Sequence, residues 1–338
     1  NSCLISSNVI NREGEKDAYM YDIIIVGSGP GGLTAGIYAS RSRMKTLMLT
    51  SQVNPSLITT TDIVENYPGF PGGISGYELI ERFTKQAGMF GLETVEDDVV
   101  SLERASRDSK DIWRVKTGKG SYDALAVILA TGTGYARLNV PGESEYTGKG
   151  VSYCATCDGP FYRDVPVAVV GGGNTAVQEA LFLTRFASRV TIIHRRDRLR
   201  ASRILQERAA AHEKIDFAWN SVVEEILGET LVKAVRISDV EDPSKKRTLE
   251  VEGVFVFTGY IPNTAFVRDV VECDESGYVI VDGEMKTSAP GIFACGDCTR
   301  KLLRQVITAC GDGATAAFAA EQYVQDLKGN AYGAWALS

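Results

Sequence analysis

Two stretches of the chain repeat one pattern of apolar and small residues. A β-branched run at 21–26 leads into a glycine-rich sequence at 27–32 and then into apolar positions at helical spacing. A second run, at 165–170, starts 144 residues later and leads into a glycine-rich sequence at 171–176, again followed by helical spacing. The pattern predicts the same unit twice: a strand, a tight turn and a helix.

The glycines of this unit indicate a nucleotide site. The first glycine permits the turn, the second lets the backbone approach a pyrophosphate, and the third allows close packing of the helix, whose first N–H groups attract an anion. One such match alone is also typical of an ordinary β–α turn. Two copies, each after a predicted strand, favour two bound dinucleotides.

The rest of the pattern extends the same plan. Buried strands are predicted at 124–130, before Thr131-Gly132, and at 254–258, before Gly259. A hairpin is predicted around 118–120, a strand and turn at 291–297, and a helix of small residues at 309–324. Because this tail follows the second unit, we expect it to complete the first domain. The predicted fold class is α/β, with two Rossmann-like dinucleotide-binding domains in three ββα layers, one inserted into the other.

Length and composition describe an ordinary globular chain. At about 150 residues per domain, 338 residues correspond to roughly two domains. Hydrophobic residues make up 44% and charged residues 23%, which excludes disorder or a coiled coil for the whole chain. The net charge of −7 disfavours nucleic-acid binding, and the apolar runs are shorter than the roughly 18 residues of a membrane-spanning helix. We expect neither a nucleic-acid partner nor a membrane segment.

Cysteine usage and the first residues bear on location. Seven cysteines are too few for a disulfide scaffold in a chain of this length, and their odd number argues against full pairing. We therefore expect a reducing compartment, the cytoplasm. Residues 1–19 lack an initial Met and an apolar signal core, so we interpret them as a tag, a linker or a presequence remnant.

The second nucleotide unit favours NADP over NAD. Its next strand ends at Ile193 and is followed by His194-Arg195-Arg196, with further arginines up to Arg200. Clustered guanidinium groups match a ribose 2′-phosphate, whereas an acidic residue would bind a free 2′-hydroxyl. The alternative is a solvated basic face on the following helix.

The first nucleotide unit leaves its ligand open. Its next strand ends at Thr50, which is neither acidic nor basic and so departs from the NAD pattern. A flavin is the natural expectation, because a hydride donor in one domain needs an acceptor in the other.

A pair of cysteines lies between the two units, at Cys154 and Cys157. Two cysteines separated by two residues can form a small reducible ring, and such thiols often have lowered pKa values. The alternatives are two buried cysteines or half of a zinc site, and for zinc the only candidate partner pair begins 141 residues later, at Cys295. The spacing favours redox chemistry and no metal.

With these features, the chain resembles the low-molecular-weight thioredoxin reductases, the class II pyridine nucleotide-disulfide oxidoreductases. The resemblance covers about residues 21–327 and is carried by 27–32, 64–69, 130–132, 154–158, 171–176, 194–196 with Arg200, and Gly296-Asp297 with Arg304-Gln305. It implies a homodimer in which NADPH reduces FAD, FAD reduces a Cys154–Cys157 disulfide, and the dithiol reduces thioredoxin. It also implies that Cys157 faces the flavin, that Cys154 attacks thioredoxin and that Asp158 supplies a proton; a plain turn residue is the alternative for Asp158.

The resemblance assigns domains and cofactor-binding residues. An N-terminal extension covers 1–19, an FAD-binding domain 20–135 and 263–338, and an NADPH-binding domain with the redox disulfide 136–262. The residues for FAD are Gly27, Ser28, Gly29, Pro30, Gly31, Gly32, Thr50, Asn66, Ala130, Thr131, Gly132, Gly296, Asp297, Arg304 and Gln305. Those for NADPH are Gly171, Gly173, Asn174, Thr175, His194, Arg195, Arg196 and Arg200. The family's NADPH domain rotates between two arrangements, and turn-rich crossings at 134–141 and 259–263 could serve as hinges.

The chain departs from the family pattern at two places. Pro55-Ser56-Leu57 replaces the usual Gly-Gly-Gln of a loop against FAD, which removes an amide and puts the flavin contacts of that loop in doubt. Cys298 makes a second Cys-x-x-Cys with Cys295, and Cys310 follows; we interpret these three as small buried hydrophobes rather than a second dithiol.

Other functions remain as alternatives. A peroxiredoxin reductase would carry a long thioredoxin-like extension, and a dithiol oxidase or a ferredoxin-driven relative would not need the arginines after Ile193. A protein that only senses NADP or redox state would bind no flavin.

Overall fold

The computed structural model describes residues 20–51, 56–61, 63–107 and 110–330. The extension at 1–19 and Pro55, on which the sequence made predictions, lie outside these residues. The described residues divide into two compact units. The first unit consists of the described residues within Asn1–Ser56, Ile80–Gly132 and Pro262–Ser338. The second unit consists of those within Leu57–Leu79 and Thr133–Ile261. The segment at 57–79 thus groups with the second unit, whereas the sequence assigned it to the FAD-binding domain.

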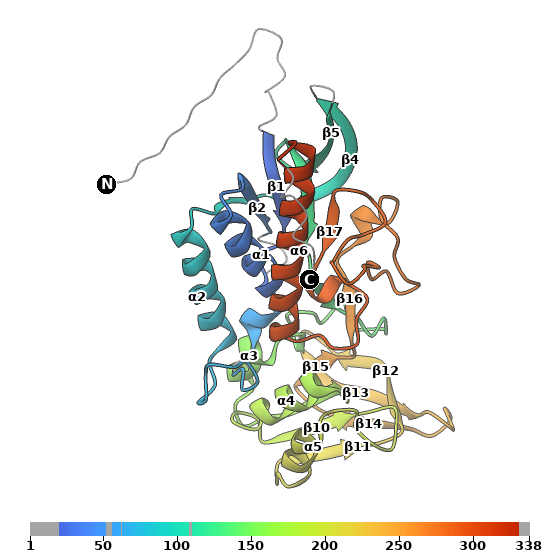
Figure 1. Cartoon of the computed structure of the whole chain (residues 1–338). Helices are drawn as coiled ribbons and strands as arrows, with labels where there is room; N and C mark the ends of the chain where they lie inside the picture. Colours follow the sequence, from blue (N-terminus) through green and yellow to red (C-terminus); the bar gives the residue numbers. More distant parts are fainter. Residues whose placement is uncertain (1–19, 52–55, 62, 108–109, 331–338) are drawn as a thin grey trace. The chain divides into compact units, whose positions relative to one another are not determined.

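The first unit is built on a mixed sheet. Its strands, in spatial order, are β3 (Glu93–Glu96), β2 (Thr46–Thr50), β1 (Met20–Val26), β6 (Ser121–Leu129), β5 (Lys110–Thr117) and β4 (Val99–Arg107). The strands from β3 to β6 are parallel, and β5 and β4 continue the sheet in antiparallel fashion. Late in the chain, β17 (Ile292–Ala294) pairs in parallel with the second half of β6. The tail therefore completes the first sheet, as Figure 1 shows.

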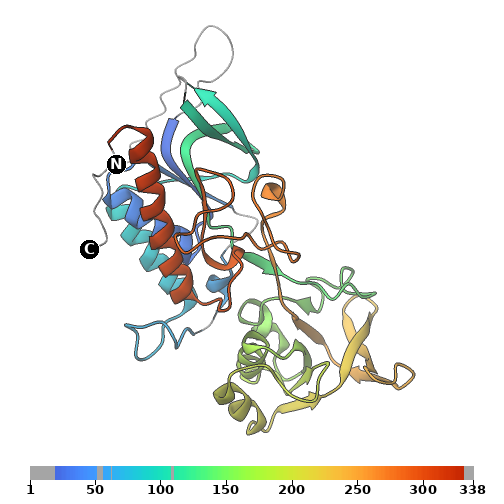
Figure 2. The same ribbon diagram turned by 45° about the vertical axis from the view of Figure 1, so that its right-hand side comes forward.

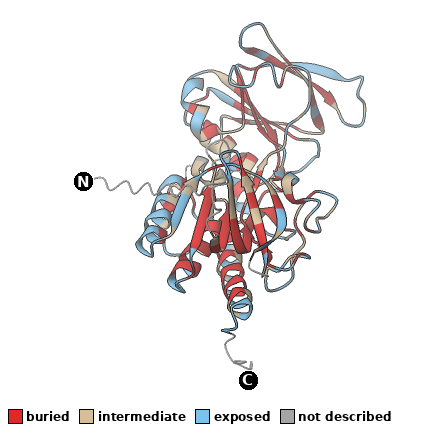
Figure 3. Ribbon diagram, turned by 90° about the horizontal axis from the view of Figure 1, so that it is seen from above, coloured by how far each residue is buried: buried red, intermediate tan, exposed pale blue. Residues whose placement is uncertain are grey.

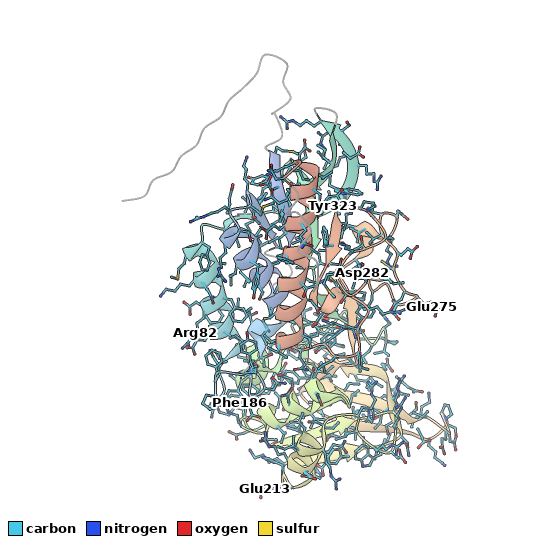
Figure 4. All side chains as sticks on the ribbon, in the orientation of Figure 1. Arg82, Phe186, Glu213, Glu275, Asp282 and Tyr323 are labelled. Atoms are coloured by element: carbon cyan, nitrogen blue, oxygen red, sulfur yellow. A yellow bond between two sulfur atoms is a disulfide. The ribbon has the colours of Figure 1, made fainter. Side chains whose placement is uncertain are left out.

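Helices α1 (Pro30–Arg41) and α6 (Val306–Leu327) cover one face of this sheet (Figures 1 and 2). Small residues let them approach closely: a Cβ atom on Gly313 would lie 2.1 Å from the carbonyl oxygen of Gly31. Tyr323 projects from α6 (Figure 4), and its ring packs edge-on against Phe293 of β17, 6.2 Å between centroids. Helix α2 (Gly76–Met89) adds Ala87 to a cluster with Leu33 of α1.

The second unit has three layers of its own. Five parallel strands lie in the order β11 (Ile215–Ala218), β10 (Arg189–Ile193), β9 (Pro166–Gly171), β15 (Gly253–Phe257) and β8 (Val151–Ser152). Helices α4 (Asn174–Leu183) and α5 (Arg203–Ala210) pack on one face, and an antiparallel sheet of β12 (Ser221–Gly228), β13 (Val232–Asp239) and β14 (Lys246–Glu250) packs on the other. Successive residues of β9 point to opposite faces, so Val169 joins the helical cluster and Val170 the sheet cluster.

Short elements complete both units. They are η1 (Leu57–Thr60), β7 (Thr133–Tyr135), α3 (Ala155–Asp158), η2 (Gly159–Tyr162), β16 (Tyr260–Pro262), η3 (Ala265–Val267) and η4 (Gly296–Cys298). Strands β7 and β16 pair with each other, and the Ala136 N–H donates to the Gly259 carbonyl at 2.9 Å. The two crossings that the sequence predicted as turn-rich segments therefore form a two-stranded ladder.

The buried residues concentrate on the strands and the exposed ones on the outer turns of helices and on loops (Figure 3). Several predicted elements are confirmed. The predicted hairpin is the β5–β6 pair, with Trp113 opposite Ala124, and the strand at 254–258 is β15. The helix at 309–324 lies within the longer α6. None of the described helices is both long and apolar enough to cross a membrane.

Candidate functional site

The two glycine-rich turns have the same construction. Gly27 has φ +109°, and a Cβ atom there would lie 2.3 Å from the carbonyl oxygen of Ala130, at the end of β6. In the second unit a Cβ atom on Gly171 would lie 2.4 Å from the carbonyl oxygen of Phe257, at the end of β15. Each first glycine thus lies directly against the end of a neighbouring parallel strand, where no side chain fits.

The helix that follows each turn begins without a side-chain cap. Gly29 is the N-cap of α1 and Gly173 the N-cap of α4, and the described residues give neither helix a capping side chain or an acidic residue in its first turn. The first N–H groups of a helix have no partner inside the helix and carry partial positive charge. Both helix starts are therefore suited to bind a phosphate group.

Polar side chains with buried, unpaired atoms lie near the first turn. Thr131 Oγ1 and Asp297 Oδ1 are both buried, and neither has a hydrogen-bond partner among the described residues. Burial raises the pKa of Asp297, although Lys301 and Arg304 act in the opposite direction. Unpaired buried oxygens destabilise a protein unless a ligand or water satisfies them. A ligand rich in hydroxyl groups fits this side of the first unit.

The loop that carries Asp297 is held by several interactions. The Gly296 N–H donates to Asp312 Oδ2 at 3.0 Å, and Lys301 forms an ion pair with the same carboxylate. The Arg304 guanidinium lies 3.9 Å from the centroid of the Tyr278 ring and donates from Nε to the Asp297 carbonyl at 3.3 Å. These contacts fix η4 and the approach to α6.

Other predicted residues of the first site have simpler surroundings. Ser28 Oγ and Thr50 Oγ1 lie 2.6 Å apart in a hydrogen bond, which ties the glycine-rich turn to the end of β2. Gln305 is the N-cap of α6, in a reciprocal capping box with Thr308. Asn66 is exposed and lies in the segment that groups with the second unit.

The arginine-rich loop lies against the second glycine-rich turn. The N–H groups of Arg200 and Ala201 donate to the Gly172 carbonyl at 2.7 and 3.1 Å, and the Ser202 N–H donates to Asn174 Oδ1 at 2.7 Å. Arg195, Arg196 and Arg200 are exposed on this loop. The structure therefore brings the backbone of the loop that carries the predicted arginines to the turn before α4, whose start suits a phosphate.

His194 differs from its arginine neighbours because its side chain is buried. A Cβ atom on Gly172 would lie 2.4 Å from the imidazole ring, so the ring packs under the turn. Burial lowers the pKa of His194, and Arg200 lowers it further. The imidazole is therefore neutral near pH 7 and adds no positive charge for a phosphate.

Cys154 and Cys157 form a disulfide with an S–S distance of 2.08 Å. Cys154 is the N-cap of α3, and the Cys157 N–H donates to Cys154 Sγ at 3.1 Å. Ser152 Oγ accepts from the Cys154 N–H at 3.0 Å and donates to the Cys154 carbonyl at 3.2 Å. Cys157 is exposed. The pair therefore exists as the disulfide that the redox interpretation needs.

Comparison with known proteins shows which family the chain belongs to. The pyridine nucleotide-disulphide oxidoreductase family matches residues 21–313. The thioredoxin reductase of Peptoclostridium acidaminophilum is 47% identical over 311 residues, covering 90% of this chain and 98% of the relative. That of Treponema pallidum is 46% identical over 308 residues, covering 91% and 98%. The solved thioredoxin reductase of Lactococcus lactis is 42% identical with a TM-score of 0.86, covering 90% of this chain and 99% of that one.

The chain belongs to the pyridine nucleotide-disulphide oxidoreductase family, among the thioredoxin reductases. The predicted resemblance, the fold class and the assignment as a thioredoxin-disulfide reductase enzyme are thereby confirmed. Membership implies use of a flavin and of a pyridine nucleotide.

Asp158, the predicted proton donor in this thioredoxin reductase family member, is half-buried directly after Cys157. Burial raises the pKa of the Tyr162 phenol, and the negative charge of Asp158 raises it further. Among the residues that the structure describes, no hydrogen bond links the Asp158 carboxyl group to Cys154 Sγ or Cys157 Sγ. Its role in proton transfer stays a prediction.

The three cysteines near η4 are buried and form no disulfide. Cys298 Sγ lies 3.3 Å from the Cys295 carbonyl and 3.5 Å from that of Leu129. Burial raises the pKa of the Cys295 and Cys298 thiols, so both stay protonated. These surroundings support their interpretation as small buried hydrophobes.

Sequence reasoning missed residues that support the two sites. Tyr260 Oη hydrogen-bonds Thr175 Oγ1 at 2.7 Å, in the first turn of α4. The repeat of Thr131-Gly132 by Thr258-Gly259 could have drawn attention to it. Asp312 carries no such signal, because it is an acidic residue outside every motif, in the part of α6 that is rich in small residues.

Proposed function

We propose that the chain is an NADPH-dependent thioredoxin reductase, in which electrons pass from NADPH through FAD to the Cys154–Cys157 disulfide and from the dithiol to thioredoxin. The observation that carries the proposal is the placement of this disulfide in the same compact unit as the arginine-flanked turn Gly171–Gly173. The unit thus combines a dinucleotide site with the group that is to be reduced. The first unit, with its own glycine-rich turn, is left for the flavin.

The residues of each unit fit the proposed cofactors. For FAD, the uncapped start of α1 would hold the pyrophosphate, and Asp297 and Thr131 would receive or donate hydrogen bonds along its polyhydroxyl chain. For NADPH, the start of α4 would hold the pyrophosphate and Arg195, Arg196 and Arg200 the 2′-phosphate. Bound together, the two cofactors supply a hydride donor and a carrier that passes two electrons to a disulfide.

The thiol chemistry then uses residues of this chain. Once reduced, Cys154 attacks one sulfur of the thioredoxin disulfide, forms a mixed disulfide and displaces the other sulfur as a thiolate. Cys157 next attacks Cys154 Sγ, which restores the ring and releases the second thioredoxin thiolate. The Cys157 N–H directed at Cys154 Sγ stabilises negative charge on the attacking sulfur. Cys154 and Cys157 each give up a proton as they attack, and two protons end on the two thioredoxin sulfurs; Asp158 would take up one of the released protons and pass it to a leaving thiolate.

The first test follows the flavin absorbance of the purified holoprotein under anaerobic conditions. Addition of NADPH should bleach the flavin band, and an equal concentration of NADH should bleach it far more slowly, because NADH lacks the phosphate that the arginines would bind. Oxidised thioredoxin, added next, should restore the band. The measurement is a stopped-flow absorbance trace at each step.

Three other outcomes would change the proposal. Bleaching without recovery on thioredoxin would keep the flavoprotein and assign the disulfide another dithiol partner. Equal rates with NADPH and NADH would remove the role of the arginine cluster. No bleaching by NADPH in a flavin-loaded sample would mean that another donor feeds the disulfide.

A homodimer and a cytoplasmic location remain part of the proposal. The first follows from the family resemblance and the second from the cysteine count. Sedimentation equilibrium of the holoprotein would give the oligomeric state directly.

A further inference from the structure

Glu143 is a buried carboxylate outside every motif of the sequence. It is 1% exposed and lies in the turn after β7, in the second unit. Its two oxygens accept hydrogen bonds from the backbone: Oε1 from the Leu138 N–H at 2.7 Å and Oε2 from the Asn139 N–H at 2.6 Å. A carboxylate this deeply buried destabilises a fold unless it is well hydrogen-bonded. Its further hydrogen bonds therefore matter for its role.

A third donor to Glu143 connects it to the redox disulfide. Tyr153 Oη donates to Glu143 Oε1 at 2.7 Å, and Tyr153 directly precedes Cys154 in the chain. Burial, and then the Glu143 carboxylate, raises the pKa of Tyr153 to about 12. The phenol therefore keeps its proton and donates throughout the neutral pH range. Its ring also stacks on Tyr135 of β7, 6.0 Å between centroids.

The two ends of the Cys-x-x-Cys loop are held very differently. On the Cys154 side, Ser152 forms two hydrogen bonds with the Cys154 backbone, and Tyr153 is bonded to Glu143. On the other side, Cys157 is exposed and lies in the single turn of α3. When the disulfide opens, the two sulfurs must separate, and the less restrained residue moves.

We propose that Glu143, acting through Tyr153, is a positioning residue that keeps Cys154 in place when the disulfide opens, so that Cys157 is the thiol that moves. This inference rests on the proposed function, in which Cys154 attacks the protein substrate. Thiol–disulfide exchange needs the attacking sulfur aligned with the bond it breaks, and small displacements of a reacting group slow such steps strongly. Glu143 touches neither sulfur and acts only through its neighbour.

The test compares three variants of the holoprotein. Tyr153→Phe removes only the hydroxyl and leaves both backbone hydrogen bonds to the carboxylate. Glu143→Gln removes the charge and one acceptor oxygen. Tyr146→Phe is the matched control, because Tyr146 is a buried core tyrosine of the same unit whose hydroxyl makes no hydrogen bond that the structure gives among its described residues.

Three readouts separate positioning from a general loss of structure. The first is turnover with thioredoxin. The second is the single-turnover reaction of the pre-reduced protein with the small disulfide 5,5′-dithiobis(2-nitrobenzoate). The third is NADPH-driven reduction of ferricyanide, which takes electrons from the flavin and bypasses the disulfide. Tyr153→Phe and Glu143→Gln should lower the first two by roughly tenfold. Their ferricyanide rate and KM for NADPH should match the unsubstituted protein, and Tyr146→Phe should change none of these.

The proposal is overturned if Tyr153→Phe reduces both disulfides at the unsubstituted rate, if ferricyanide turnover falls by the same factor, or if Tyr146→Phe loses as much. If Glu143→Gln does not fold, Tyr153→Phe decides alone, since it leaves the buried carboxylate satisfied. If the unsubstituted protein fails to reduce thioredoxin, the proposed function is wrong. The small-disulfide readout still tests Glu143 in that case.

Discussion

At the level of single residues, buried polar atoms without a hydrogen-bond partner indicate where a ligand would bind. Asp97 and Asp297 each have one buried carboxylate oxygen without a partner among the described residues. Only Asp297 also lies in η4 beside a basic residue that lowers its pKa against the effect of burial. A buried acceptor without a partner destabilises the folded protein, and a ligand that donates a hydrogen bond to it removes this cost and is bound more tightly. Asp297 is therefore the residue of the first unit whose substitution is most informative.

Replacing Asp297 by Asn should weaken FAD binding by roughly tenfold to a hundredfold, because hydrogen bonds to a charged acceptor are about twice as strong as neutral ones. Flavin content after dialysis, or titration of the flavin-free protein with FAD, measures this. Asp269→Asn is the control, since Asp269 is exposed and belongs to the same unit. Equal FAD affinity in the two variants would exclude Asp297 as a flavin ligand.

The same substitution has a consequence for pH. Because burial raises the pKa of Asp297 in the folded state, the folded protein binds this proton more tightly than the unfolded chain does. The flavin-free protein should therefore lose stability relative to Asp297→Asn as the pH rises above about 4, the usual pKa of an unfolded Asp. Urea unfolding of both flavin-free proteins at several pH values gives the difference, which should vanish at the acidic end.

At the level of elements, the glycine-rich turns were the part of the site that the sequence predicted well. Backbone packing dictates them locally: a Cβ atom on Gly32 would lie 1.9 Å from the carbonyl oxygen of Gly27, which no other residue can accommodate. Long apolar runs such as β6 and β15 were equally clear. In contrast, the strands β12, β13 and β14 alternate polar and apolar residues over short spans; the predicted ββα fold class included such a layer, but the sequence did not assign its strands.

Supporting residues of the sites could not be predicted because their roles depend on contacts between distant segments. Glu143 follows Pro141-Gly142, and such a glutamate normally lies on the surface. Only the fold shows that it is buried against Tyr153. For His194, which the sequence grouped with the arginines of the NADPH site, only the fold shows that the ring packs under Gly172 while its arginine neighbours are exposed.

Two glycine-to-alanine variants should separate the effect of close backbone packing on stability from the effect of helix propensity. Gly32→Ala should destabilise the first unit by about 1–3 kcal/mol or more, because the added methyl group meets backbone that cannot yield. Gly311→Ala should be neutral or stabilising by up to about 1 kcal/mol, since nothing lies within 4 Å of its Cβ position and alanine favours a helix. Urea unfolding measures both. If Gly32→Ala is as stable as Gly311→Ala, the close packing of the first turn is not required.

At the level of the whole molecule, the proposed electron path needs both compact units. The disulfide belongs to the second unit, and the groups suited to a flavin belong to the first. The chain passes between the units at 56–57, 79–80, 132–133 and 261–262, and the last two of these passages lie at β7 and β16, which pair with each other. A ladder of two short strands can change its angle to each unit by small backbone rotations at its ends. The family resemblance implies a rotation of this kind, which would let the disulfide face the flavin in one arrangement and thioredoxin in the other; for this chain the rotation stays a prediction.

Joining the two units covalently should therefore stop turnover with thioredoxin. The holoprotein would be treated with a short bifunctional lysine reagent at low protein concentration, and peptide mapping would verify links between residues of the first and second units. Links within one unit, isolated from the same reaction, form the control and should leave turnover unchanged. In the inter-unit product, either flavin reduction by NADPH or flavin oxidation by the disulfide should persist, but not both in succession, since each needs its own arrangement. Full thioredoxin turnover in a verified inter-unit product would show that electrons reach the substrate without rotation, and the two crossings would then be structural connections only.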